Sequence, residues 1–192
     1  FAAAVWGLAF VFQKSAMDHI GPLTFLAARG AVAALALAPL AVREGRRSRQ
    51  KPIGSVLPIA VSGGVTFFVA GWLQQAGLVD ATVTNTGFLT ALYVVITPFI
   101  AWTWSGKLPS RLVWPAVALS AFGTWLLGGG ALSAFSTGDM LVAASAVFWA
   151  MHVVITGRAA PFGRPIVFTA VQFATVAVFA TCGALLLETI TL

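Results

Sequence analysis

Residues 22–42 read PLTFLAARGAVAALALAPLAV, an apolar stretch that contains a single charged side chain, Arg29. A helix needs about 20 mostly apolar residues to cross a bilayer, so this stretch predicts a membrane-spanning helix. A charge at membrane depth costs a few kcal/mol, and arginine keeps its proton in proteins. The stretch therefore predicts a membrane protein and makes Arg29 a residue whose role needs an explanation.

The rest of the chain has the same character. Of its 192 residues 59% are hydrophobic and 8% are charged, whereas soluble domains carry about 25% charged residues. A soluble bundle of this composition would lack polar residues for its surface. We therefore expect an all-α fold, a polytopic transmembrane helix bundle, with spans over 1–17, 22–42, 54–78, 81–104, 112–130, 139–158 and 165–187.

Basic residues lie in alternate linkers. The 43–53 loop, REGRRSRQKPI, is rich in arginine, and the linkers at 107–111 and 158–164 carry further basic residues. The linkers on the opposite side have none, so the positive-inside rule places the N-terminal side in the cytoplasm. The 43–53 loop lacks the interleaved aromatics of a nucleic-acid patch. We expect it to contact lipid headgroups and expect no nucleic-acid partner.

Two parts of the chain align without gaps at an offset of 143 residues. Segments 4–17 and 22–34 match segments that begin at residues 147 and 165. Five spans separate the start of the first copy from the start of the second, so the second copy enters the membrane from the other side. Such inverted repeats are typical of secondary transporters. The matched residues that are least expected by chance are Trp6 with Trp149, Pro22 with Pro165 and Phe25 with Phe168.

Several motifs carry a family resemblance: VWGLAFVFQK, FLAARGAVAAL, NTGFLTALYVVITPFIAW, PSRLVWPAVALSAFGTWLL and GDMLVAASAVFWAMHVVITGR. Together they resemble the EamA branch of the drug/metabolite transporter (DMT) superfamily. The resemblance implies ten helices in two inverted five-helix repeats, of which this chain would hold seven. Residues 1–130 would form the first repeat and residues 139–192 the truncated start of the second. Relatives of this kind export amino acids and other small metabolites.

Polar side chains recur at helical spacing inside the predicted spans, where such residues usually face the bundle interior or water. The alternative is that they only hold helices together. We expect a substrate pathway lined by Trp6, Gln13, Lys14, Arg29, Thr86, Thr90, Tyr93, Thr97, Trp149, His152, Thr156 and Gln172.

Three of these residues leave alternatives open. Lys14 can snorkel to the headgroups or place a charge in the cavity, as the resemblance suggests. His152 can titrate near neutral pH or pack as a hydrogen-bonded side chain. Arg29, whose repeat counterpart is Gln172, is expected to face the central cavity, where it either binds a substrate carboxylate or bonds polar groups of the fourth span. Snorkelling is its third alternative.

These features favour a secondary transporter, and specifically an exporter of small metabolites across the cytoplasmic membrane by alternating access. A phosphate-binding GxxxxGK[ST] motif is absent from the sequence, so the chain itself is not expected to hydrolyse ATP. We expect no cofactor, metal or catalytic residue. Its expected partners are the substrate, the bilayer and a second copy of the protein. The alternatives are a membrane scaffold and, less favoured, an intramembrane enzyme.

Overall fold

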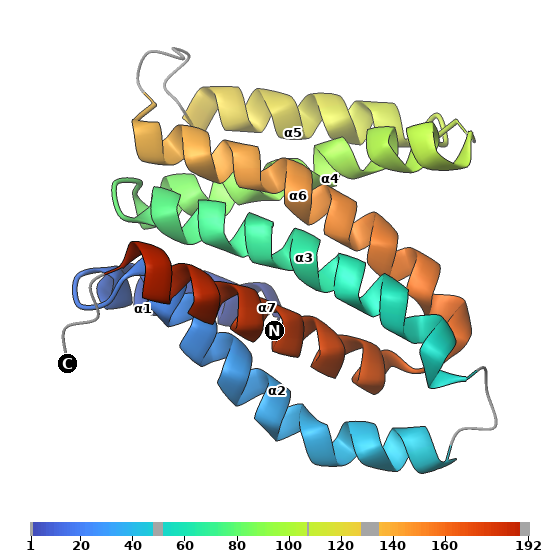
Figure 1. The fold of residues 1–192 in the computed structure, drawn as a ribbon. Coiled ribbons are helices and arrows are strands. Elements are labelled where there is room, and N and C mark those ends of the chain that lie inside the picture. The colour runs from blue at the N-terminus through green and yellow to red at the C-terminus, as the bar shows by residue number, and fades with distance from the viewer. Residues whose placement is uncertain (1, 48–51, 107, 128–134, 189–192) are drawn as a thin grey trace. The chain divides into compact units, whose positions relative to one another are not determined.

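The computed structural model describes residues 2–47, 52–106, 108–127 and 135–188, and within these ranges the chain is helical without a strand (Figure 1). This confirms the predicted all-α class. The elements in chain order are α1 (Ala2–Met17), α2 (Pro22–Arg47), α3 (Ile53–Leu78), α4 (Val83–Ser105), α5 (Val113–Leu127), α6 (Thr137–Ala159), the short 3-10 helix η2 (Ala160–Phe162) and α7 (Pro165–Leu187).

Each predicted span coincides with one helix. Among the residues that the structure describes, five helices are long and apolar enough to cross a membrane, namely α2, α3, α4, α6 and α7. Helices α1 and α5 are shorter, with 16 and 15 residues. The predicted end of the fifth span, at residue 130, lies outside the described residues.

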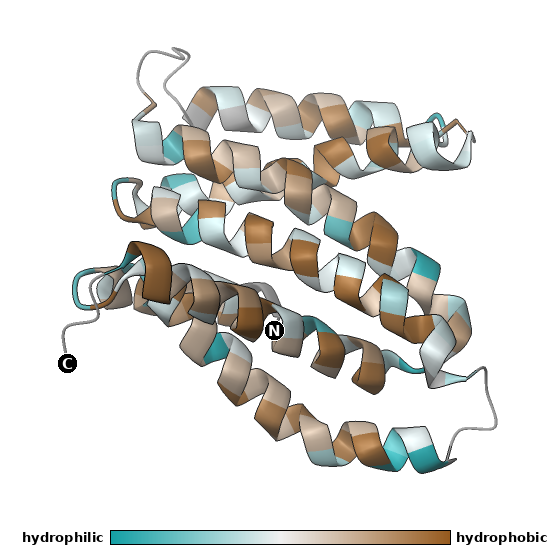
Figure 2. Cartoon of the chain, in the orientation of Figure 1, coloured by the Kyte–Doolittle hydropathy of each residue, from teal (hydrophilic) through white to brown (hydrophobic). Residues whose placement is uncertain are grey.

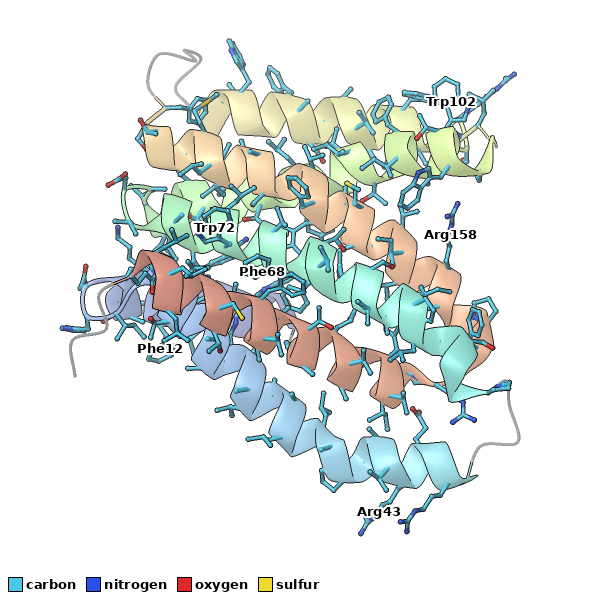
Figure 3. All side chains as sticks on the ribbon, viewed as in Figure 1. Phe12, Arg43, Phe68, Trp72, Trp102 and Arg158 are labelled. Atoms are coloured by element: carbon cyan, nitrogen blue, oxygen red, sulfur yellow. The ribbon has the colours of Figure 1, made fainter. Side chains whose placement is uncertain are left out.

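One boundary was predicted wrongly, because α2 continues to Arg47 instead of ending at residue 42. Arg43 therefore lies in the helix and not in a loop. Arginine and glutamate are good helix formers, so the helix continues after the apolar stretch has ended. Figure 2 shows the hydrophilic end of α2, and Figure 3 shows Arg43 projecting away from it.

The chain divides into two compact units, which are described separately. The first unit comprises Phe1–His19 and Ala70–Met151, and the second comprises Ile20–Val69 and His152–Leu192. Helices α3 and α6 each contribute one part to each unit, because the division falls inside them.

In the first unit, α3 and α6 approach each other through two glycines. A Cβ added at Gly77 would lie 2.5 Å from the carbonyl oxygen of Gly138 and 3.0 Å from the backbone nitrogen of Val142. Small residues allow such close backbone contact between membrane helices. Beside this contact, Val142 packs in a buried cluster with Ala81 and Leu89, so the close approach and the apolar cluster together join α6 to α3 and α4.

In the second unit, α2 and α7 lie side by side and run antiparallel (Figure 1). Leu26 of α2 packs in a buried cluster with Val176 and Ala180 of α7. Farther along the pair, a Cβ at Gly30 would lie 3.1 Å from the backbone nitrogen of Ala177. The helices are therefore in close contact over much of their length.

The single cysteine, Cys182, is exposed on α7. The buried residues of α7 follow a spacing of four, and Ala180 and Ala184 belong to this face. Cys182 lies two residues from each of them, which places it on the opposite side of the helix.

Candidate substrate-binding site

A groove between α1 and α4 in the first unit brings together three of the predicted pathway residues. Its volume is about 260 Å³, which suits a small metabolite better than a large ligand. Trp6 and Phe10 form its α1 wall, and Thr90 and Tyr93 lie on its α4 wall. The remaining lining residues are small or apolar: Gly7, Gly87, Ala91 and Val94.

The lining of the α1–α4 groove carries no formal charge. Its side-chain hydrogen-bonding groups are the hydroxyl of Thr90, the phenol of Tyr93 and the indole N–H of Trp6. Aromatic walls with a few fixed polar groups are typical of small-molecule sites. The groove can therefore hold a compact ligand through ring contacts and a small number of hydrogen bonds.

Buried amides next to the groove fix the α4 wall. Gln74 Nε2 of α3 donates to Thr90 Oγ1 at 2.8 Å, and both side chains are 4% exposed. Because this bond uses an acceptor site on the hydroxyl, Thr90 keeps its own proton as a donor. The neighbouring Gln75 donates from Nε2 to Gln13 Oε1 of α1, and this pair is also buried. The two glutamines of α3 thus bond to both helices that form the groove.

Thr86 and Thr97, the other threonines of α4 that were predicted to line the pathway, have a different environment. Thr86 is fully buried, and its hydroxyl donates to the carbonyl oxygen of Thr82 at 2.8 Å. Thr97 donates to the carbonyl oxygen of Tyr93 at 2.6 Å. Neither residue is among those that line the groove. Thr82 is the N-cap of α4 and accepts a hydrogen bond from the backbone N–H of Asn85.

Lys14 binds the C-terminal end of α3. Its Nζ donates to the carbonyl oxygens of Leu78 at 2.9 Å and Val79 at 2.7 Å. The last carbonyls of a helix lack intrahelical donors and carry partial negative charge, so a lysine there both caps the helix and complements its dipole. This contact adds a third role to the two expected for Lys14.

Replacing Lys14 with methionine is expected to lower the free energy of unfolding by about 1 kcal/mol, because the carbonyls of Leu78 and Val79 lose a charged donor while the apolar stem remains. Thermal unfolding of the detergent-solubilised protein measures this effect. Lys14→Arg, which keeps the charge, should retain most of the stability. A methionine variant as stable as the parent would indicate that Lys14 only snorkels.

The remaining candidate of the first unit, Trp149, lies on α6 and is partly buried. It is not among the residues that line the α1–α4 groove. The division between the two units falls between Trp149 and His152 of the same helix.

In the second unit, two predicted residues bond to each other. Gln172 Nε2 and His152 Nε2 are 3.0 Å apart, and the His152 ring packs against Phe67 with the ring centroids 5.2 Å apart. A Cβ at Gly63 would overlap the amide of Gln172, so this glycine leaves room for it. His152 is therefore a hydrogen-bonded packing residue here, which was one of its two predicted roles.

Arg29 and Thr156 lie in other parts of the second unit. The guanidinium of Arg29 lies over the ring of Phe25, 5.5 Å from its centroid, and such cation–π contact stabilises a cation at low polarity. Thr156 lines a second pocket of about 380 Å³, together with Arg164 and Phe168. Arg164 is 5% exposed, and nothing in its sequence context distinguished it from an ordinary loop arginine.

The sequence predictions missed part of the groove. Phe10 and Gly87 were not proposed as site residues, although Phe10 lies one turn from Trp6 on α1 and this spacing could have indicated it. Gln74 and Gln75 were visible as polar residues in a span. Their bonds to α4 and α1 depend on how the helices pack, which spacing within α3 does not reveal.

The five long apolar helices of the described residues indicate a multi-pass helical membrane protein. The chain belongs to the EamA-like transporter family, whose sequence profile matches residues 1–129. It is 29% identical over 163 residues to a protein of Archaeoglobus fulgidus (strain ATCC 49558) described as an uncharacterized transporter. That alignment covers 85% of this chain and 49% of the relative, so the chain spans about half the length of the curated relative it matches. No solved structure matches the chain.

Proposed function

We propose that the chain is part of a secondary transporter that exports small metabolites, such as amino acids, across the cytoplasmic membrane by alternating access. The α1–α4 groove contributes the substrate contacts, with Trp6 and Tyr93 as its aromatic walls. The observation that carries this proposal is the meeting of Trp6, Thr90 and Tyr93 in one groove inside a transporter fold. The N-terminal side faces the cytoplasm in this proposal, as the basic linkers indicate.

The surroundings of the groove favour transport over catalysis. Its lining offers hydrogen-bond donors and rings but no acid, base or charged nucleophile. An intramembrane hydrolase would need a histidine beside a nucleophile. Here His152 is bonded to the amide of Gln172 and packs on Phe67. These contacts support a ligand-holding site, and the remaining spans of the full-length protein would complete the second repeat.

Trp6→Ala in the full-length protein is expected to raise the KM for transport about tenfold, which corresponds to about 1.4 kcal/mol of lost ligand contact. Trp125→Ala is a matched control, since Trp6 is 51% exposed and Trp125 of α5 is 48% exposed and lies outside the groove. The assay is counterflow of radiolabelled amino acids in proteoliposomes. Absence of counterflow for every amino acid and metabolite class tested, with the protein folded, would refute the proposed function.

Equal effects of Trp6→Ala and Trp125→Ala on the KM would instead refute the assignment of the groove while leaving transport itself intact. A loss of kcat with unchanged KM would point to an effect of Trp6 on conformational change and not on substrate contact. The two parts of the proposal are therefore tested separately.

A further inference from the structure

The chain contains two glutamates, Glu44 and Glu188, and each binds the N-terminus of a helix in the second unit. Glu188 follows α7, and its carboxylate accepts from the backbone N–H groups of Leu23 at 2.7 Å and Thr24 at 2.9 Å, and from the Thr24 hydroxyl at 2.7 Å. A carboxylate stabilises a helix N-terminus because the first N–H groups have no intrahelical partner and carry partial positive charge.

Glu44 caps the N-terminus of α7 at the other end of the α2–α7 pair. It lies near the C-terminal end of α2, and its carboxylate accepts from the N–H groups of Val167 at 2.7 Å and Ile166 at 3.4 Å at the start of α7. Each helix of the pair therefore caps the N-terminus of the other with a glutamate near its own C-terminal end. We call these two contacts the reciprocal caps.

The reciprocal caps obey the offset of 143 that relates the two repeats. Leu23 corresponds to Ile166 and Thr24 to Val167, so the N–H groups that are capped are equivalent. Both helices begin with an equivalent proline, which is suited to the first helical position and leaves the next two N–H groups to be capped. The two glutamates lie within one residue of equivalent positions.

A contact in the middle of the α2–α7 pair also follows the offset of 143 residues. A Cβ at Gly30 would lie 3.2 Å from the carbonyl oxygen of Phe173, which is the residue 143 positions later. A residue that touches its own repeat counterpart lies near the axis that relates the two copies. The contacts of the α2–α7 pair, from Glu188 through Gly30 to Glu44, are therefore those expected around a two-fold axis.

The two caps lie at opposite ends of α2, a helix long and apolar enough to cross a membrane. Thr24 and Glu44 are about 30 Å apart along α2 at the rise of an α-helix, which matches the thickness of the hydrocarbon core. In alternating access, a transporter built from inverted repeats opens to one face and then to the other. When such a transporter opens to one face, the contact at that face would break while the equivalent contact at the other face would hold.

From this geometry we propose that Glu44 and Glu188 are positioning residues for transport: each holds one end of the α2–α7 pair closed, and release of one cap favours opening to the membrane face on which it lies. The inference rests on the proposed function. It adds two residues that are not among those lining the α1–α4 groove, and it predicts that their effects have opposite signs.

The test uses a cysteine reporter in the full-length protein, in which Ala91 of the groove is replaced by cysteine and Cys182 and any other cysteine are removed. A membrane-impermeant maleimide is applied to each face of oriented vesicles. Glu188→Gln is expected to raise labelling from the face that carries Glu188 about tenfold relative to the opposite face, since loss of a charge-assisted bond biases the equilibrium by about 1.4 kcal/mol. Glu44→Gln should shift the ratio the other way, and the double variant should return it toward the parent value.

Gly21→Val provides a second way to disturb the same cap without changing a charge. A Cβ at Gly21 would overlap the Glu188 carboxylate, so the valine should reproduce the direction of Glu188→Gln. Asp18→Asn removes a negative charge from an exposed residue of the adjacent linker and should leave the labelling ratio unchanged.

Shifts of the same sign in both glutamine variants, or no shift in either, would overturn the proposal, because general loosening would expose the reporter to both faces equally. Counterflow in vesicles that hold the same glutamate variants with the native Ala91 separates the inference from the proposed function. Opposite shifts without any transport would refute the proposed function alone, whereas transport without opposite shifts would refute the role of the caps.

Discussion

Replacing Gly77 with valine is expected to destabilise the first unit by about 3 kcal/mol, the upper end of the cost of overpacking. The added Cβ would lie 2.5 Å from the carbonyl oxygen of Gly138, 2.8 Å from Cγ2 of Val142 and 3.0 Å from the Val142 backbone nitrogen. Two of these are backbone atoms, which no change of rotamer can move away. Helices α3 and α6 would have to separate. Thermal unfolding of the detergent-solubilised full-length protein measures the loss.

Gly123→Val is the control, because Gly123 is also a glycine within a helix of the first unit but has open space around its Cβ position. Valine has a higher helix propensity than glycine, so this variant should be as stable as the parent or slightly more so. Equal melting temperatures for the two variants would show that α3 and α6 do not depend on this glycine contact.

Gly87→Leu is expected to reduce transport by about tenfold or more, the loss that follows when a ligand is displaced from contacts worth at least 1.4 kcal/mol. Gly87 lines the α1–α4 groove, and a Cβ there meets no atom within 4 Å. A leucine can therefore enter the groove without a clash in the protein. The substrate would lose that space, while the helix itself would gain up to about 1 kcal/mol in propensity. The measurement is counterflow in proteoliposomes beside thermal unfolding of the same preparation.

The matched variant is Gly123→Leu, which adds the same side chain where no groove residue lies. Its transport should equal that of the parent. Retained transport in Gly87→Leu would mean that the substrate does not use the α1–α4 groove. If both transport and the melting temperature fell, the loss of transport would be explained by impaired folding. The prediction is therefore met only by a variant that is stable and transports little.

Gly77 and Gly87 cannot be told apart by their position in the sequence. Both are glycines in apolar helices, ten residues apart on consecutive helices. One is pressed against the backbone of α6, and the other opens onto the α1–α4 groove. Replacement by a larger aliphatic residue is therefore expected to lower stability at Gly77 and to lower transport at Gly87.

The helices could be predicted from the sequence because a membrane span is a local property. About 20 apolar residues are enough to specify one, and each predicted span coincides with a helix. The error at the end of α2 has the same local origin. Hydropathy reports where the apolar stretch ends, whereas Arg43 and its neighbours continue the helix through their backbone bonds.

The candidate site was predicted only in part. Thr90 and Tyr93 were both proposed from the sequence as pathway residues, and both line the groove. Spacing could not separate them from Thr86 and Thr97, whose hydroxyls bond to carbonyl oxygens within α4. A threonine can satisfy its hydroxyl within its own helix or across a groove, and only its neighbours decide between the two.

The sequence by itself determined that the chain is a membrane protein, where its helices lie and which transporter family it resembles. These properties follow from local hydrophobicity and from motif order. The tertiary structure alone decided that Lys14 caps α3, that Gln74 bonds Thr90, and that Glu44 and Glu188 cap each other's helices. Each of these contacts joins residues at least 16 positions apart in the chain. Inside a membrane, unpaired polar groups must find partners in the protein, and helix packing determines which partners come within reach.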